Sequence, residues 1–225
     1  AGSQSKTIEN INSDTESVND EAKDKISDTT TSTIRLIGIT AGGGFVGVGV
    51  TIAVLLVFTE VHAIMAGNVQ NAKNVSVHAG IDYGQVLTGT LAITGGAVAV
   101  SVSGAVTYFQ ANVVSAIGGS ANLTGVTSTI SVTTTGNTNA IAAAASAGGG
   151  AVAVNAGMAL TINRTRVDTF IGQGVVINAP SAAITVQTQY TANAIAFTFA
   201  FSGGAVAVGA TLAIVINLLD SYTYI

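Results

Sequence analysis

The chain has 225 residues, of which 48% are hydrophobic and only 8% are charged, and its formal net charge is −4. In typical soluble domains about a quarter of the residues are charged. This chain has far fewer, so a basic surface for nucleic acid is excluded. The absence of cysteine excludes a disulfide framework and thiolate chemistry. Its 27 glycines and single proline, with abundant Ala, Val and Ile, favour closely stacked strands.

The N-terminal segment, residues 1–33, differs from the rest of the chain. Seven acidic and three basic side chains lie before Arg35, and together they account for the whole net charge. One stripe of this segment has steps of three and four positions and comprises Ile8, Ile11, Thr15, Val18, Ala22 and Ile26. This spacing predicts an amphipathic helix over residues 5–27, and a disordered acidic linker is the alternative. Residues 1–33 are therefore an acidic helical cap or linker, and no signal peptide is expected in this sequence.

A glycine motif recurs from residue 34 onward. It reads GGFVGV at Gly43–Val48 and GGAVAV at Gly95–Val100, Gly149–Val154 and Gly203–Val208. The interval from one glycine pair to the next is therefore nearly constant. Such a period predicts stacked units that bury a shared core. Residues 34–225 are interpreted as repeats whose copies start near residues 43, 95, 149 and 203, the last one incomplete.

The repeats have the pattern of strands. Small and large residues alternate in Ala194–Phe201 and in Ala205–Ile216, as they do when one face of a strand points inward. Each glycine pair interrupts a long apolar run and is predicted to form a corner. We expect a mainly β protein, a parallel β-solenoid of about 54-residue repeats, with two coils per repeat favoured over three. The valines Val98, Val152 and Val206 are expected to point inward.

A competing interpretation is a polytopic membrane protein. The run Leu36–Thr59 is uncharged and exceeds the length of about 20 residues that a helix needs to cross a bilayer, and Ala192–Leu219 is longer still. The period of two, the β-branched residues and the lack of a lysine and arginine asymmetry between the loops favour strands. Membrane contact is therefore not predicted.

One polar column distinguishes the copies. At the same distance after the last valine of each motif stand Glu60, Asn112, Arg166 and Asp220. A position that is always polar but changes sign predicts a turn that faces water, and a charged ladder that binds a ligand is the alternative. The pair Asn163 and Asn217 is a further candidate for a ladder of asparagines at a turn.

No catalytic, cofactor-binding or metal-binding residues are predicted. The two histidines, His62 and His78, lie in one copy without a repeated partner, and they are interpreted as surface residues. The carboxylates Glu60 and Asp82 also share a copy, but their spacing fits no catalytic template. No lysine follows a glycine cluster as it does in a phosphate-binding loop. The sequence therefore predicts a protein that is not an enzyme and uses no cofactor.

The glycine motif, together with Thr169–Ile171 and Thr223–Ile225 (T-F/Y-I), resembles the repeats of large secreted surface proteins of gram-negative bacteria. These include filamentous haemagglutinin-like and leukotoxin-like passengers of autotransporter or two-partner routes, and the resemblance covers residues 34–225. It implies a secreted or outer-membrane-associated chain with a structural or adhesive role. The expected partners are adjacent solenoid blocks, further copies of the chain, or a host-cell surface. The alternative is a membrane-active cytotoxin that inserts exposed residues such as Phe197, Phe199 and Phe201.

Overall fold

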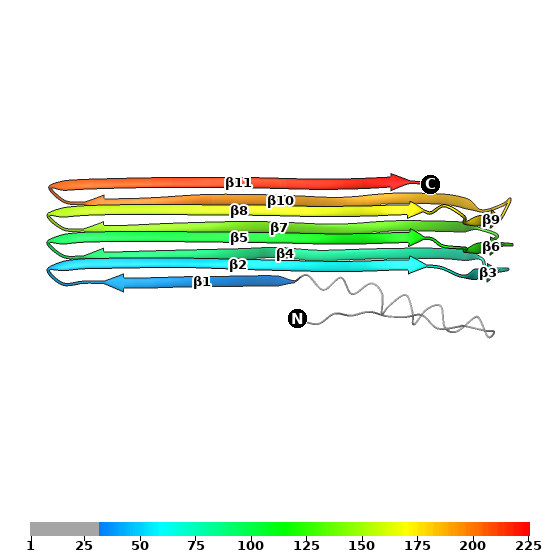
Figure 1. Cartoon of the computed structure of the whole chain (residues 1–225), viewed down its shortest axis with the longest axis horizontal. Coiled ribbons are helices and arrows are strands. Elements are labelled where there is room, and N and C mark those ends of the chain that lie inside the picture. The colour runs from blue at the N-terminus through cyan, green and yellow to red at the C-terminus, as the bar shows by residue number, and fades with distance from the viewer. Residues whose placement is uncertain (1–31) are drawn as a thin grey trace. The chain divides into compact units, whose positions relative to one another are not determined.

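The computed structural model describes residues 32–225, which are built from strands and turns (Figure 1). The helix or linker predicted within residues 1–33 lies outside the described residues, apart from its last two positions. The strands are β1 (Thr33–Gly42), β2 (Val46–Met65), β3 (Asn68–Gln70), β4 (Asn74–Gly95), β5 (Val98–Ile117), β6 (Asn122–Thr124), β7 (Thr129–Gly149), β8 (Val152–Ile171), β9 (Val176–Asn178), β10 (Ala183–Gly203) and β11 (Val206–Tyr224).

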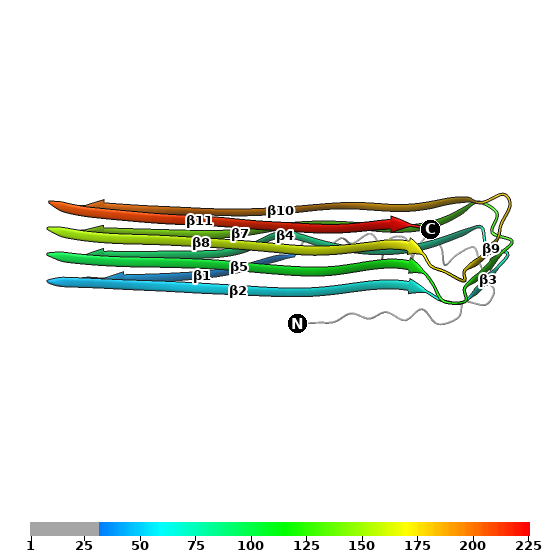
Figure 2. The ribbon, with the colours of Figure 1, turned by 45° about the horizontal axis from the view of Figure 1, so that its top comes forward.

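Three parallel sheets make up the described part of the chain. Sheet A has the order β1-β4-β7-β10, sheet B has the order β11-β8-β5-β2, and the short sheet C has the order β3-β6-β9. The chain passes from A to B to C and back to A, and each passage adds one strand to each sheet (Figures 1 and 2). This arrangement is a three-sided parallel β-solenoid, and the predicted fold class is confirmed.

Each copy of the glycine motif begins a new strand of sheet B. Val46 pairs with Val98, Val98 with Val152, and Val152 with Val206. One coil therefore separates successive copies, and the expectation of two coils per repeat is wrong. That expectation assumed strands of ordinary length, about 5 or 6 residues. Here β2, β5 and β8 each have 20 residues, because neighbours of the same length pair with them from end to end.

The glycine pairs form the corner between sheets A and B, as predicted. Each pair lies at the end of a strand of sheet A, and one residue separates it from the next strand of sheet B. The corner amides bond from one coil to the next: Gly150 N donates to Gly203 O at 2.9 Å, and Val152 N donates to Ala97 O at 3.0 Å. The corner thus satisfies its backbone groups within the stack.

The direction expected for the three valines is wrong. Val98, Val152 and Val206 lie side by side in sheet B, but they point outward, and the side chains of Val152 and Val206 are 37% and 56% exposed. The neighbouring Ala99 and Ala153 point inward and are fully buried. Sheets A and B approach so closely near the corner that only small side chains fit between them.

The core widens with distance from the corner. Near the corner it is a small cluster of alanines, Ala105, Ala142, Ala144 and Ala159. Farther along it contains Phe109, whose ring makes an edge contact with Tyr83 at 5.2 Å. Against sheet C it consists of larger aliphatic residues such as Ile117, Leu123 and Ile130. The solenoid therefore has a thin half at the corner and a thicker half at sheet C (Figure 2).

The alternative interpretation, a polytopic membrane protein in which Leu36–Thr59 and Ala192–Leu219 span the bilayer as helices, is wrong. Leu36–Thr59 lies in β1, β2 and the corner between them, and Ala192–Leu219 lies in β10, β11 and their corner. Among residues 32–225, no helix is long and apolar enough to span a membrane.

Candidate functional surface

The polar column occupies neighbouring positions on the outer face of sheet B. Glu60 pairs with Asn112, Asn112 with Arg166, and Arg166 with Asp220. Glu60, Arg166 and Asp220 are exposed or half-exposed, and Asn112 is half-buried. The column faces water as predicted, but the prediction of a turn is wrong because the four residues lie inside long strands.

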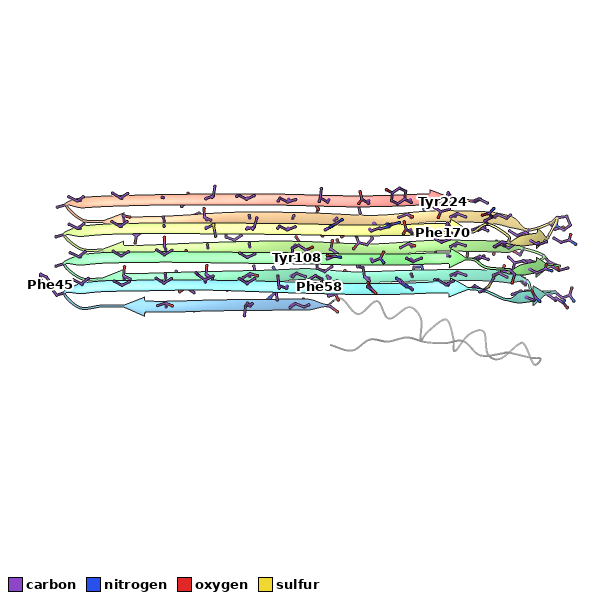
Figure 3. All side chains as sticks on the ribbon, in the orientation of Figure 1. Phe45, Phe58, Tyr108, Phe170 and Tyr224 are labelled. Atoms are coloured by element: carbon purple, nitrogen blue, oxygen red, sulfur yellow. The ribbon has the colours of Figure 1, made fainter. Side chains whose placement is uncertain are left out.

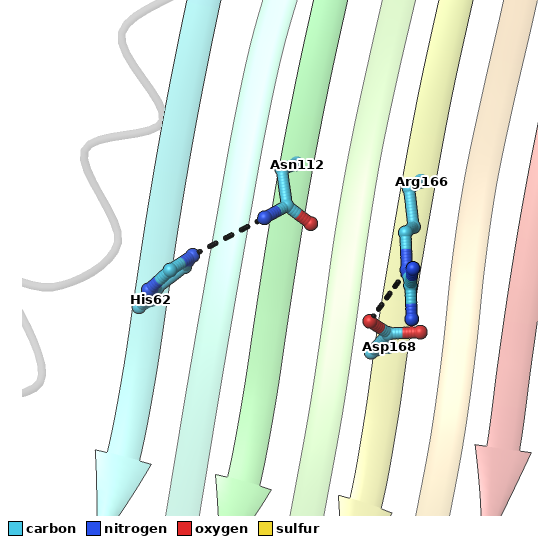
Figure 4. A network of polar contacts seen from close by, with 4 residues as sticks. All are labelled: His62, Asn112, Arg166 and Asp168. Carbon is cyan, nitrogen blue, oxygen red and sulfur yellow. Dashed lines mark hydrogen bonds and ion pairs between the residues drawn. The ribbon is translucent and has the colours of Figure 1, made fainter.

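An ion pair and a histidine contact lie on this face (Figure 4). Arg166 Nε donates to Asp168 Oδ2 at 2.9 Å, and its guanidinium lies 5.5 Å from the centre of the Tyr222 ring. The hydrogen bond to Asp168 and its negative charge raise the pKa of Arg166 above the ordinary value. Asn112 Nδ2 lies 3.5 Å from His62 Nε2. Exposed pairs of this kind contribute little to stability. The side chain of Arg166 is 62% exposed and that of Asp168 only 14%, so Arg166 is the accessible member of the pair.

The structure separates the two histidines. His62 lies on β2 in sheet B, whereas His78 lies on β4 in sheet A. The two ring nitrogens of His78 lie 3.0 Å from Thr133 Oγ1 and 3.3 Å from Thr135 Oγ1. Glu60 and Asp82 are likewise on different sheets. Within the described residues, no three His, Cys, Asp or Glu side chains gather as they would around a metal ion.

The asparagine pair points into the solenoid and does not lie at a turn. Asn163 pairs with Asn217 in register, and Asn163 is fully buried. Its Nδ2 donates to Asn193 O at 3.3 Å, while Asn217 Nδ2 donates to Ala192 O at 2.8 Å. Both amides therefore join sheet B to sheet A.

Other inward polar side chains also join the two long sheets. Thr161 Oγ1 donates to Ile195 O at 2.6 Å, and Thr107 Oγ1 donates to Ile141 O at 2.7 Å. Asn155 Nδ2 donates to Phe201 O at 2.6 Å. A buried polar group destabilises the fold unless it is hydrogen-bonded, so these bonds offset part of the cost of a polar interior. Within residues 32–225, no such partner is found for the buried hydroxyls of Thr90, Thr94, Ser103 and Ser146.

The outer surface of the thin half is apolar. We call this thin half the corner half and define it as residues 36–56, 87–108, 141–162 and 195–216, which contain no charged residue and no histidine. Its outward residues are Val, Ile, Leu, Phe, Met, Ala and Gly, with Tyr108 the only one that carries a polar side-chain group. The most exposed include Ile39 (69%), Ile52 (70%) and Phe201 (66%). This apolar surface lies on both long sheets.

Aromatic residues line the boundary of the corner half on sheet B and continue beyond it. The rings of Phe58 and Tyr108 are 5.6 Å apart, and those of Phe170 and Tyr224 are stacked 5.0 Å apart. Figure 3 places Phe45 at the corner, Phe58 and Tyr108 about midway along their strands, and Phe170 and Tyr224 nearer sheet C. The outer surface thus passes from apolar to aromatic and polar along each strand.

The sequence-based prediction placed the large apolar residues of sheet B, such as Val152 and Val206, in the interior, and therefore underestimated this exposed surface. It singled out Phe197, Phe199 and Phe201, which are indeed exposed by 41%, 51% and 66%. The rest of the apolar surface could have been found from the residues that alternate with it along each strand, which are almost all Gly, Ala, Ser, Thr or Asn. Where such small residues alternate with large apolar ones, the small ones can occupy the interior.

No protein-family model, no curated protein and no solved structure matches this chain. Function has to be inferred from the surface itself.

Proposed function

We propose that the chain is a structural and adhesive segment of a large secreted or surface-exposed bacterial repeat protein, and that it is not an enzyme. The observation that supports this proposal is the pairing of coils in register along both long sheets. Such pairing repeats each outward column at the strand spacing, about 4.8 Å. A rigid surface with regular spacing suits an elongated scaffold better than a catalytic centre.

The adhesive surface in this proposal is on sheet B, in the half of the solenoid nearer sheet C. We call this half, which carries the charged residues, the polar half. Its outward groups include Glu60, Arg164, Arg166 and Asp220, so that both signs of charge are present across the strands. A mixed row of charges at fixed spacing can pair with charges on a host-cell surface molecule. Neighbouring solenoid blocks are the other partners we propose, since they would pair with the outer strands of the stack.

Binding of the full chain to immobilised extracellular-matrix proteins tests the adhesive role. We expect retention to fall at least tenfold when the column is neutralised by Glu60→Gln, Arg166→Gln and Asp220→Asn together. The matched control is Gln187→Ala, Gln189→Ala and Thr191→Ala on the outer face of sheet A, which should leave retention unchanged. If the unaltered chain is not retained at all, the adhesive part of the proposal is wrong.

A membrane-active, leukotoxin-like cytotoxin is a second candidate, because the corner half exposes large apolar side chains. Phe197, Phe199 and Phe201 lie in a row on the outer face of β10. Release of dye from loaded liposomes would support this function. Liposomes that stay intact would argue against a cytotoxin without affecting the structural proposal.

A further inference from the structure

We infer that the corner half is a surface for insertion into a lipid bilayer. The solenoid would enter the hydrocarbon with its glycine corner first, and its polar half would stay in water. This inference does not depend on the adhesive role, which concerns the other half of the molecule and is tested without lipid. It also differs from a cytotoxic function, since insertion need not cause leakage.

The first argument is that the two halves of the solenoid have opposite polarity. In the half near sheet C, large apolar residues such as Phe109 and Ile117 are fully buried, and charged residues such as Arg166 face outward. In the corner half the interior holds small residues such as Ala153 and Asn155, while large residues such as Met158 face outward. The outer surface of each half therefore matches a different solvent.

The second argument is that the apolar surface surrounds the thin half. On sheet B it reaches Ile216, and on sheet A it reaches Ile195. These limits lie at similar distances from the corner, because Asn217 Nδ2 bonds to Ala192 O across the sheets. A protein partner of ordinary size covers one face, whereas lipid chains cover both. Monomeric soluble proteins rarely leave so much apolar surface uncovered.

The third argument is the length of the apolar surface. The outward apolar residues of β11 run from Val206 to Ile216, which corresponds to about 33 Å at the strand rise. The hydrocarbon core of a bilayer is about 30 Å thick. Phe58 and Tyr108 lie at the boundary, where aromatic rings are enriched in membrane proteins. The charged column begins directly beyond them, at Glu60.

The fourth argument concerns the backbone. Groups that enter lipid must find hydrogen-bond partners within the protein. The corner meets this demand from coil to coil, as in the bonds from Gly96 N to Gly149 O at 3.2 Å and from Val206 N to Ala151 O at 3.0 Å. No charged side chain of the corner half has to be carried into the hydrocarbon. The corner bonds can therefore stay intact in lipid, whereas the outermost strands β1, β2, β10 and β11 each have an open edge that needs a further strand beside it.

A reporter experiment with the full chain tests this inference. The chain has no tryptophan, so Phe199→Trp supplies a single reporter on the outer face of the corner half. With phosphatidylcholine vesicles we expect its emission to shift to shorter wavelength and to be quenched by brominated acyl chains. Gln189→Trp is the matched control, on the same strand and the same face but in the polar half, and it should change little.

Lysine substitutions at the same two positions supply the second measurement. Phe199→Lys should weaken partitioning into the vesicles on the order of 100-fold, because a lysine in hydrocarbon is strongly unfavourable. Gln189→Lys should leave partitioning unchanged. Met158→Lys, on sheet B, should reproduce the loss. All three side chains point outward, so circular dichroism should show an unchanged β spectrum.

Two results would overturn the inference. One is the absence of any spectral shift for Phe199→Trp in the presence of vesicles. The other is an unaltered chain that sediments as an oligomer, becomes monomeric with Phe199→Lys and does not bind vesicles. That result would show that a second copy of the chain, and not lipid, covers the corner half.

Discussion

The two glycines of each corner pair have different surroundings. A Cβ atom on the first glycine, Gly95, Gly149 or Gly203, would meet no atom within 4 Å. A Cβ atom on the second, Gly96, Gly150 or Gly204, would collide with the carbonyl oxygen of the second glycine in the preceding coil. The second position therefore has to be glycine, because a backbone atom cannot move aside as a flexible side chain can.

This difference predicts opposite outcomes for substitutions at adjacent positions. Gly150→Ala should lower the free energy of unfolding by about 1 to 3 kcal/mol, as overpacking usually does. Gly149→Ala should change it by no more than about 0.5 kcal/mol, in the range of ordinary surface substitutions. Guanidinium unfolding of both variants followed by circular dichroism gives the comparison. Equal losses at the two positions would contradict this account of the corner.

A half-buried tyrosine shows how a glycine makes room in the thicker half. Burial raises the pKa of Tyr190 to about 12, and its hydroxyl has no hydrogen-bond partner among the described residues. The ring of Tyr190 lies where a Cβ atom on Gly136 would be. The glycine in β7 thus makes room for the aromatic side chain of the next coil.

The long strands show how much of the fold could be predicted from the sequence. Repetition of the glycine motif and the period of two predicted a parallel β-solenoid with glycine corners, because both features follow from local backbone preferences. Which residues of a strand face the interior could not be predicted in the same way. Either Val206 or Ala207 can face inward in an alternating strand, and the choice depends on how closely sheets A and B approach each other.

The polar column has the same explanation. Glu60 and Arg166 were predicted to be exposed because their position is polar in every copy although its charge changes sign. Their location inside strands could not be predicted, since it depends on strands of 20 residues that only end-to-end pairing allows. The apolar surface of the corner half was missed for a related reason: large aliphatic residues were assigned to the core by default.

Pairs of strands in the thin half are joined by hydroxyl groups, which leads to a prediction for Thr161. Thr161 is fully buried and donates to Ile195 O at 2.6 Å. Thr161→Val keeps the shape but removes the donor, so the free energy of unfolding should fall by about 1 kcal/mol. Thr191→Val, on the outer face of β10, is the control and should have almost no effect. A loss no larger than that of the control would mean that packing alone holds the two sheets together.

At the scale of the whole stack, β11 has an open edge. Within the described residues it pairs with β8 and with no other strand. In a parallel pair, alternate residues direct their N–H groups to opposite sides. Val206 N donates to Ala151 O toward β8, so odd-numbered residues of β11 direct their amides to the open edge. Unpaired edges of this kind can pair with another chain.

We therefore expect the purified chain to stack end to end, and Ala213→Pro should prevent it. Proline at residue 213 removes an amide from the open edge and leaves the bonds to β8 in place, whereas Leu212→Pro removes a bond within sheet B. Sedimentation velocity should show assembly of the unaltered chain that grows with concentration, and a folded monomer for Ala213→Pro. Leu212→Pro should lose stability as well, on the order of the 3 kcal/mol that a proline inside a helix costs, because it too removes a backbone hydrogen bond. If Ala213→Pro assembles as readily as the unaltered chain, association does not depend on the edge of β11 and proceeds through the open edge of β10 or through the outer faces.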